Sequence, residues 1–400
     1  MLYVICWLTD FASVLFIFSA TRALAEQGTG SIAMGCIGAI YFLMAAASNT
    51  FWGRMADRWG RRQVVLAGTV VMLVCTLLAA SQEMIPGLIY PAFVTGGVAA
   101  GMIWPAVMAW LGRETEGRST SRTYLLFCIA FNLGMASGQS SGGWLFESFG
   151  MVAPLLISAG LTTISFVCVW FLTELSTPDI RKPAADAPHL VHGEIARAFA
   201  RLSWVANFGG MFAMSTVWFL FPQLVVSLGV GADSHGIILA LGRGVTISVF
   251  ILMHFFQFWR FRFLTAALAQ ATGVAGLILV SAATTEILLA GGIAALSVMM
   301  GYNYFSSLTY HATGYSDQRR GMAFGLQEAF LAFGAAGGSC LGGIVGAFWG
   351  ENGPFRLAAA LVEILIILQW VLWWRLVYPL QRQRVHTATE PSESNPMPAL

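Results

Sequence analysis

The fold of this chain is decided by the segment 53–62, which reads Gly53-Arg54-Met55-Ala56-Asp57-Arg58-Trp59-Gly60-Arg61-Arg62. It holds four arginines and one aspartate, and it separates two long apolar stretches, 31–52 and 64–82. A helix that crosses a hydrocarbon core of ~30 Å needs about 20 mostly apolar residues, so both stretches are long enough to cross a membrane. Because basic residues collect in loops that stay in the cytoplasm, the segment is predicted to be a cytoplasmic loop between two spans.

The composition of the whole chain agrees with a membrane protein. Of its 400 residues, 10% are charged and 57% are hydrophobic, whereas a soluble domain carries about 25% charged residues. The net charge of +2 excludes the usual nucleic-acid-binding proteins, and the lack of polar bulk excludes a disordered chain. The six cysteines lie apart within apolar runs, so we expect no disulfide framework, no metal site and no cofactor.

Apolar runs further along the chain predict twelve spans, and the fold class is therefore an all-α polytopic membrane protein. The predicted spans are 3–22, 31–52, 64–82, 87–110, 123–146, 152–173, 202–228, 235–258, 263–283, 287–310, 321–347 and 355–376. The first run ends in Ala23-Leu24-Ala25, which is similar to a signal-peptidase site. No basic residue precedes that run and Asp10 interrupts it, so we expect it to stay as a helix.

Orientation follows from the basic residues. With the N-terminus in the cytoplasm, Arg22 and Arg356 fall outside and Arg243 lies within a span, which leaves eighteen of the 21 basic residues inside. The acidic residues expected outside are Glu26, Glu83, Glu147, Asp233, Glu286 and Glu351. This asymmetry predicts that both termini are cytoplasmic and that the number of spans is even.

Glycines recur in the two halves at an offset of about 200 residues. Gly28, Gly30 and Gly35 match Gly229, Gly231 and Gly236, and the span-five set Gly134, Gly138, Gly142 and Gly143 matches Gly334, Gly338, Gly342 and Gly343. Small residues at this spacing let helices approach closely in lipid, and the pattern predicts a parallel six-plus-six repeat. The predicted organisation is a six-helix bundle over 1–173, a cytoplasmic linker over 174–201 with a short amphipathic helix near 194–202, a second bundle over 202–378 and a disordered cytoplasmic tail over 379–400.

The segment 53–62 resembles the G-x-L-A-D-R-x-G-R-R/K signature between helices two and three of the major facilitator superfamily, in particular of its twelve-helix general group. The residues in register are Gly53, Ala56, Asp57, Arg58, Gly60, Arg61 and Arg62. The resemblance implies two six-helix bundles in which this motif holds the halves together at the cytoplasmic side and releases as the carrier switches. Asp57 can accept bonds from an arginine or face the positive end of the helix that starts near Gly321, although topology alone explains the arginines.

Two features of many proton-coupled family members are absent here. Span five reads Gly138-Gln139-Ser140-Ser141-Gly142-Gly143, without the proline that follows a glycine in many drug antiporters. Span four reads Ala92-Phe93-Val94-Thr95-Gly96, without the arginine that precedes a glycine. Both absences weigh against proton-driven drug export.

Four ionisable residues fall within the predicted spans: Asp10, Arg243, Glu328 and Glu363. Each needs a partner, a water-filled cavity or a neutral state, because a charge at mid-membrane costs roughly 2.5–3.5 kcal/mol. Arg243 can bind a carboxylate or phosphate of a substrate, or pair permanently with Glu328. Asp10 and Glu328 can carry protons for coupling, or hydrogen-bond to a neighbouring helix. We expect Glu363 to be structural.

By the same resemblance, spans one, four, seven and ten face the centre. The candidates they offer beside Asp10 are Asn207, Trp218, Tyr302, Asn303 and Tyr304, together with Trp104, Trp204 and Gln223. Aromatic rings with a few hydrogen-bonding groups suit an amphipathic organic solute, although each residue could instead pack within the protein. His254 and His311 lie near inner ends, where snorkelling is the plainer expectation.

The leading hypothesis is a secondary carrier, expected to be monomeric and located in a bacterial inner membrane. It would move a small organic solute, for which an anionic group and proton coupling are both open alternatives. No nucleotide-binding G-x-x-x-x-G-K-S/T motif is present, so a gradient would supply the energy. The alternatives are a non-transporting relative that acts as a sensor or assembly partner, and a membrane enzyme, for which no catalytic motif is found.

Overall fold

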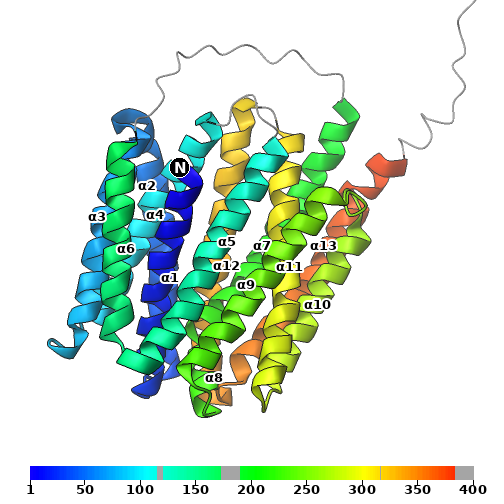
Figure 1. The fold of residues 1–400 in the computed structure, drawn as a ribbon. Coiled ribbons are helices and arrows are strands. Elements are labelled where there is room, and N and C mark those ends of the chain that lie inside the picture. Colours follow the sequence, from blue (N-terminus) through cyan, green and yellow to red (C-terminus); the bar gives the residue numbers. More distant parts are fainter. Residues whose placement is uncertain (115–119, 173–189, 316, 383–400) are drawn as a thin grey trace, which may run out of the picture.

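The computed structural model describes residues 1–114, 120–172, 190–315 and 317–382, and the regular secondary structure within them is helical (Figure 1). The helices are α1 Leu2–Glu26, α2 Ser31–Trp59, α3 Arg61–Ala80, the short 3₁₀ helix Ser81–Glu83, α4 Ile89–Glu114, α5 Thr120–Phe149, α6 Val152–Phe171, α7 Leu190–Phe219, α8 Phe221–Ser227, α9 Ala232–Phe255, α10 Phe263–Ser281, α11 Glu286–Gly314, α12 Asp317–Trp349 and α13 Gly353–Leu376. Most run side by side along one common direction, as expected for a bundle that crosses a bilayer.

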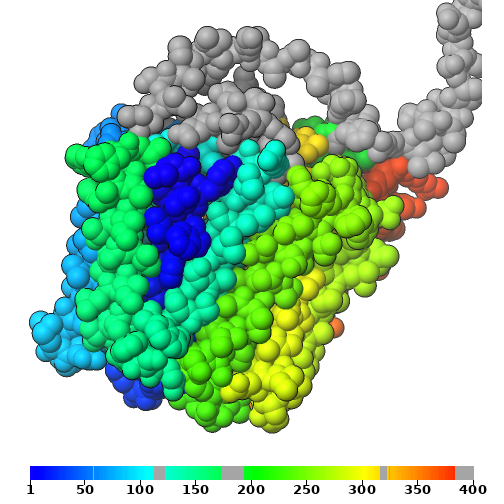
Figure 2. Space-filling model, in the orientation of Figure 1, coloured from blue at the N-terminus to red at the C-terminus, as the bar shows by residue number. Residues whose placement is uncertain are grey.

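The helices form two halves that meet along two helix pairs. Helices α1–α6 pack mainly among themselves, and so do α7–α13, while α5 packs on α9 and α2 packs on α12 between the halves. Figure 2 shows one face of the molecule, on which α1, α5 and α9 lie next to one another without a gap. This face therefore joins helices from both halves.

Ten described helices are long and apolar enough to cross a membrane, or eleven if the bent pair of α7 and α8 is one span. The bend of 44° falls at Leu220, just before Pro222 in the first turn of α8, where a proline without an N–H fits best. The predicted seventh span is therefore broken rather than continuous. Helix α5 is not among these candidates, although it is 30 residues long, because small and polar residues lower its hydropathy. The count of twelve spans agrees with this architecture once α5 is included.

Two predicted segments differ from the structure. Helix α7 begins at Leu190, so the predicted amphipathic helix near 194–202 is continuous with the seventh span instead of standing alone. Residues 190–201 thus belong to the second half and not to the linker. Residues 378–382 are helical, whereas the rest of the predicted tail, 383–400, lies outside the described residues, as does the linker segment 173–189.

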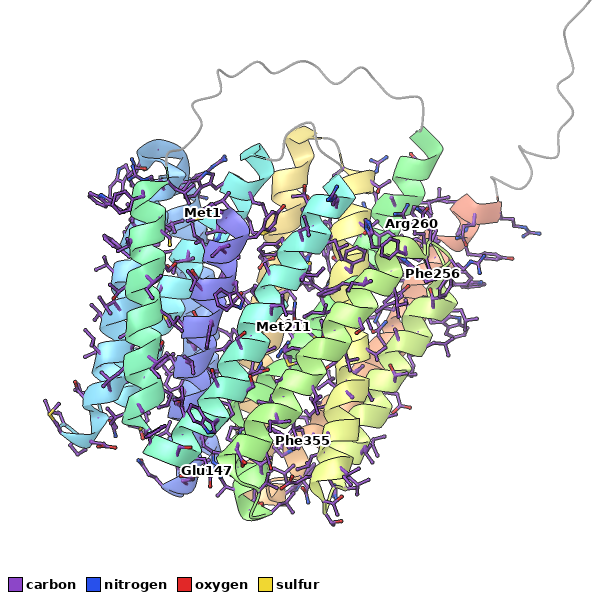
Figure 3. The ribbon with its side chains drawn as sticks, in the orientation of Figure 1. Met1, Glu147, Met211, Phe256, Arg260 and Phe355 are labelled. Carbon is purple, nitrogen blue, oxygen red and sulfur yellow. The ribbon has the colours of Figure 1, made fainter. Side chains whose placement is uncertain are left out.

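The two ends of the bundle differ in charge. We call the end that carries Met1, Arg61 and Arg260 the basic end, and the end that carries Glu26, Glu147 and Glu286 the acidic end. Figure 3 labels Met1 and Arg260 near one end of the bundle and Glu147 and Phe355 at the other. The separation of charge predicted from the sequence is therefore present in the fold.

The glycine repeat corresponds to repeated packing within the halves. A Cβ on Gly134 of α5 would meet the backbone oxygen of Trp7 at 2.5 Å, and a Cβ on Gly334 of α12 would meet the backbone oxygen of Phe208. Trp7 and Phe208 are themselves 201 residues apart. Helix α5 thus lies on α1 as α12 lies on α7, and the glycines are required because no side chain fits between these backbones.

Glycines also form the contacts between the halves at the acidic end. A Cβ on Gly35 of α2 would meet the Ser339 carbonyl oxygen and lie 2.8 Å from the Gly343 Cα of α12. A Cβ on Gly236 of α9 would meet the Gln139 carbonyl oxygen and lie 3.1 Å from the Gly143 Cα of α5. The two sites are related by the repeat, since each partner is offset by 200 or 201 residues. Backbone therefore touches backbone twice across this interface.

Candidate functional site

The acidic end is closed by reciprocal hydrogen bonds between the halves. The Arg22 Nη2 donates to the Val230 carbonyl oxygen at 3.0 Å, and the Gln223 Nε2 donates to the Thr29 carbonyl oxygen at 2.6 Å. Arg22 and Gln223 are 201 residues apart, and so are Thr29 and Val230. Each half thus uses the end of its first span to hold the loop of the other half.

A third contact at this end involves a helix terminus. The Glu147 Oε2 of α5 accepts from the backbone N–H of Ala232, the first residue of α9, at 2.7 Å. A carboxylate at this position satisfies a free N–H group and faces the positive end of the helix. The contact joins the halves at the same level as the two reciprocal bonds.

Asp10 of α1 is buried near the middle of the bundle. Its side chain is 4% exposed, and within the described residues its Oδ2 has no hydrogen-bond partner. The cation that acts on this carboxyl is Arg243 of α9, which belongs to the other half. A buried carboxyl oxygen without a partner is costly to keep, so Asp10 has capacity for a proton or a ligand group.

Arg243 lies on the second half, about 17 Å along α9 at 1.5 Å per residue. Its guanidinium lies over the Trp218 ring at 5.7 Å from the centroid, and its Nη2 donates to the Met214 sulfur at 3.4 Å. In the described part of the chain no carboxylate oxygen lies within 4.0 Å of it, so the predicted alternative of a permanent pair with Glu328 is wrong for this structure. Neither an aromatic face nor a thioether neutralises a guanidinium, which leaves Arg243 suited to an anion.

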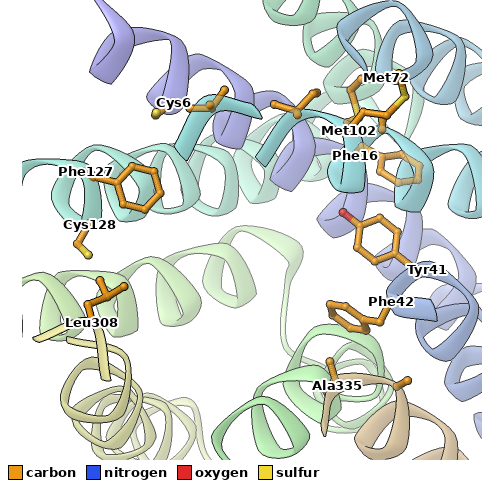
Figure 4. Close-up of a cluster of buried hydrophobic side chains, with 14 of the residues drawn as sticks. Cys6, Phe16, Tyr41, Phe42, Met72, Met102, Phe127, Cys128, Leu308 and Ala335 are labelled. Carbon is orange, nitrogen blue, oxygen red and sulfur yellow. The ribbon is translucent and has the colours of Figure 1, made fainter. Parts of the chain in front are cut away.

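Trp218 links this arginine to the opposite half. Its ring stacks on Phe42 of α2 with centroids 5.8 Å apart, and Phe219 next to it packs on Tyr41 and Phe93. Figure 4 shows Tyr41 and Phe42 side by side on α2. These rings form an aromatic layer between the closed acidic end and the level of Arg243.

Tyr304 and Glu328 lie near Asp10, and we call Asp10, Arg243, Tyr304 and Glu328 the central group. The charges that act on the Tyr304 hydroxyl include Glu328 of α12 and Asp10 of α1. Glu328 is exposed, although it lies three helical turns from Ser339 on the same face of α12, and that face packs on α2 at the acidic end. The close packing of α12 on α2 at the acidic end therefore does not cover the Glu328 side chain.

Three other predicted substrate residues lie within the second half instead. The Tyr302 hydroxyl is 2.9 Å from the Thr265 Oγ1 of α10. The Asn303 Nδ2 donates to the Ala206 carbonyl oxygen at 3.1 Å, and the Asn207 Nδ2 donates to that of Ser203 at 3.0 Å. Tyr302 and Asn303 therefore tie α11 to its neighbours in the same half, and of the Tyr302-Asn303-Tyr304 cluster it is Tyr304 that joins the central group.

The segment 53–62 joins α2 to α3 at the basic end, but it is not the loop that the sequence predicts: residues 53–59 are the last turns of α2, and α3 begins at Arg61. Gly60 separates the helices with φ +97°, a backbone conformation that favours glycine. Arg61 donates to the Ala109 carbonyl oxygen of α4, and Arg62 donates to the Val169 and Trp170 carbonyl oxygens of α6. Both arginines thus bind the ends of helices of their own half. They therefore help to hold that half together, in addition to orienting the chain in the membrane. The Asp57 side chain lies outside the described residues.

Sequence reasoning missed a buried network around His311. This side chain is 0% exposed, and its Nε2 accepts from the Trp204 Nε1 at 2.8 Å. Its Nδ1 therefore carries the proton, assigned from this bond, and donates to the Ser307 carbonyl oxygen at 2.7 Å. The snorkelling expected for His311 is wrong. The spacing of four residues between Ser307 and His311 could have shown that they share a helix face.

These features define a membrane transporter built from two related six-helix halves. A family model described as Major Facilitator Superfamily matches residues 2–317, and the chain belongs to that family. The sequence resemblance drawn from segment 53–62 is thereby confirmed.

Curated relatives are transport proteins that match over part of their length. Multidrug resistance protein 2 of Bacillus subtilis is 25% identical over 143 residues, which are 36% of this chain and 35% of that protein. Tetracycline resistance protein, class C, of Escherichia coli is 27% identical over 194 residues, 48% of this chain and 46% of that protein. Efflux pump dotC of Dothistroma septosporum is 25% identical over 266 residues, 66% of this chain and 42% of that protein. The chain thus spans less than half the length of each.

Solved structures agree with the fold over nearly the whole chain. The nucleoside transporter NupG gives a TM-score of 0.68 at 14% identity and covers 93% of this chain and 99% of its own. The human organic anion transporter MFSD10 (TETRAN) gives 0.68 at 15% identity and covers 92% and 98%. Identities this low show the shared fold and do not identify a solute.

Proposed function

We propose that this protein is a secondary active transporter that moves a small organic solute by alternating access, with the basic end in the cytoplasm of a bacterial cell. The observation that carries the proposal is the pair Asp10 and Arg243. Two buried ionisable groups on opposite halves act on each other electrostatically, and in the described residues they form no ion pair. Such groups are rare within membranes and mark ion or substrate pathways.

The solute is proposed to be an amphipathic molecule with an anionic group. Arg243 would bind the anion, while Trp218 and the rings of the aromatic layer would contact the apolar part. Asp10 would be the coupling residue, because its unpartnered oxygen can take a proton when an anion occupies Arg243. Energy would then come from a proton gradient, and the carrier would work as a monomer.

Thermal unfolding of the purified protein tests the anion site. We expect benzoate and benzyl phosphate to raise the melting temperature more than their matched neutral and cationic analogues, benzamide and benzylamine, since a ligand that binds the folded state stabilises it. Arg243→Gln should remove more than half of the rise caused by the anions. Arg356→Gln, at an exposed arginine of the acidic end, is the matched control and should keep the rise. Equal losses for the neutral and anionic compounds would assign Arg243 a structural role.

The segment 53–62 is proposed to control the switch between states through Asp57. The proposed role gives Asp57 a charge-assisted hydrogen bond, and such a bond is worth about 1.5–3 kcal/mol. Because Asp57→Asn would remove its charge, we expect turnover in proteoliposomes to fall at least about tenfold. The melting temperature should change little, because the substitution conserves shape. Glu351→Gln, at an exposed carboxylate of the opposite end, is the control. Unchanged flux of a compound found in the thermal screen would remove the gating role of Asp57.

A further inference from the structure

His235 occupies an unusual place in the closed acidic end. It lies in the first turn of α9, between Gly236 and the Ala232 N–H that Glu147 binds. Its ring is 4.7 Å from the Phe18 ring of α1 and 5.4 Å from the Phe221 ring of α8, measured between centroids. The imidazole is thus held between aromatic rings from the two halves.

The imidazole has no polar partner in this position. It is 1% exposed, and neither ring nitrogen has a hydrogen-bond partner within the described residues. Hydrogen bonds satisfy nearly all buried polar groups, so a doubly unpartnered histidine requires an explanation. A phenylalanine or leucine would fill this apolar space without the cost of two unsatisfied nitrogens.

His235 lies next to positive charge in the closed state. Arg22 of α1 is the charged group that acts on it, and the first turn of α9 adds the positive end of a helix. At the acidic end the other ionisable groups of the packed elements are exposed: Glu26 on α1, Glu147 on α5, Asp233 on α9, Glu286 on α11 and Arg356 on α13. The buried Asp10 on α1 and Arg243 on α9 lie deeper in the bundle, two or more helical turns away along their helices. Of the carboxylates, Glu26 is bound to Arg22 and Glu147 to the α9 N-terminus, while α8 has no ionisable residue. No carboxylate therefore compensates an imidazolium here.

We propose that His235 is a proton-operated element of this gate, through which acidity on the outer side favours opening of the acidic end. Separation of the halves would move Phe18 and Arg22 away from the ring and admit water. The open state then binds a proton that the closed state rejects, and by linkage the bound proton stabilises the open state. The inference rests on the proposed alternating access and adds a site of regulation distinct from Asp10 and Arg243.

The test measures opening without a substrate. Unnatural amino acids at positions 83 and 286, two exposed sites of the acidic end on opposite halves, carry spin labels for distance measurement in lipid nanodiscs. Between pH 8 and pH 5, the range over which histidine ordinarily changes charge, we expect the population with a long distance to rise at least ~3-fold. His235→Phe and His235→Gln should both abolish the rise. His254→Phe, at the other end of α9, should retain it.

Gly236→Val serves as a reference that opens this end by steric means. If it lengthens the distance while pH has no effect, or if His235→Phe keeps the pH response, the role of His235 is overturned and alternating access stands. If neither Gly236→Val nor pH changes the distance, both proposals fail together.

Discussion

Replacing Gly236 with valine is expected to hold the acidic end open and to reduce transport at least about fivefold. A Cβ at this position meets the Gln139 carbonyl oxygen of the other half and lies 3.1 Å from the Gly143 Cα. Both obstacles are backbone atoms of a helix, which cannot rotate away as a side chain can. Overpacking costs typically 1–3 kcal/mol, which shifts the equilibrium between closed and open states about 5- to 150-fold.

The same helix offers a matched control for this substitution. Gly244 of α9 has no atom within 4 Å of an added Cβ, so Gly244→Val makes the same chemical change in a place with room. We expect the spin-label distance between positions 83 and 286 to lengthen in Gly236→Val and to stay unchanged in Gly244→Val. Gly35→Val should reproduce the effect of Gly236→Val, because the repeat places Gly35 against Ser339 and Gly343 in the same way. A short distance in both Gly236→Val and Gly35→Val would show that the acidic end is not a moving gate.

The sequence could predict features that depend on spacing along one helix. The span positions follow from the length of apolar runs, and the twofold arrangement follows from glycines at a constant offset, such as Gly134 and Gly334. The break between α2 and α3 follows from the charged segment between two apolar stretches, although the helices extend further into that segment than the apolar runs predict. Each of these properties depends on residues close in sequence or on a regular repeat.

Features that depend on a partner far along the chain could not be predicted. The sequence places Arg22 among the two basic residues at the outer side, but its bond to Val230 joins residues 208 positions apart. Tyr302 and Tyr304 are two positions apart on α11, so they point about 160° away from each other and face different neighbours. Which of the two faces the centre depends on the rotation of α11 in its half. For the central group, the ionisable residues could be found from the sequence, whereas the absence of an Arg243–Glu328 pair required the structure.

Replacing Gly338 with valine is expected to destabilise the second half strongly. A Cβ at this position of α12 meets the Phe212 carbonyl oxygen of α7 and lies 2.5 Å from the Ser215 Oγ. Gly337, the preceding residue, would place its Cβ 3.7 Å from the nearest atoms of the Phe212 ring, which is ordinary van der Waals contact. We expect Gly338→Val to lose about 3 kcal/mol and roughly 6–12 °C of melting temperature for a half of this size, and Gly337→Val to stay close to the wild type.

A glycine of the first half adds a third variant to this comparison, with an intermediate expected loss of stability. A Cβ on Gly138 of α5 would lie 2.9 Å from both the Phe11 carbonyl oxygen and the Val14 Cβ, which is a milder clash than that at Gly338. Thermal unfolding in detergent should therefore rank the variants with Gly337→Val most stable, Gly138→Val intermediate and Gly338→Val least stable. Gly138 and Gly338 are equivalent positions of the repeat, although the side chains around them differ. The ranking therefore tests whether α5 packs on α1 in the same way as α12 packs on α7. If Gly337→Val were as damaging as Gly338→Val, helix propensity rather than contact with α7 would explain the loss, since both changes place a β-branched residue in α12.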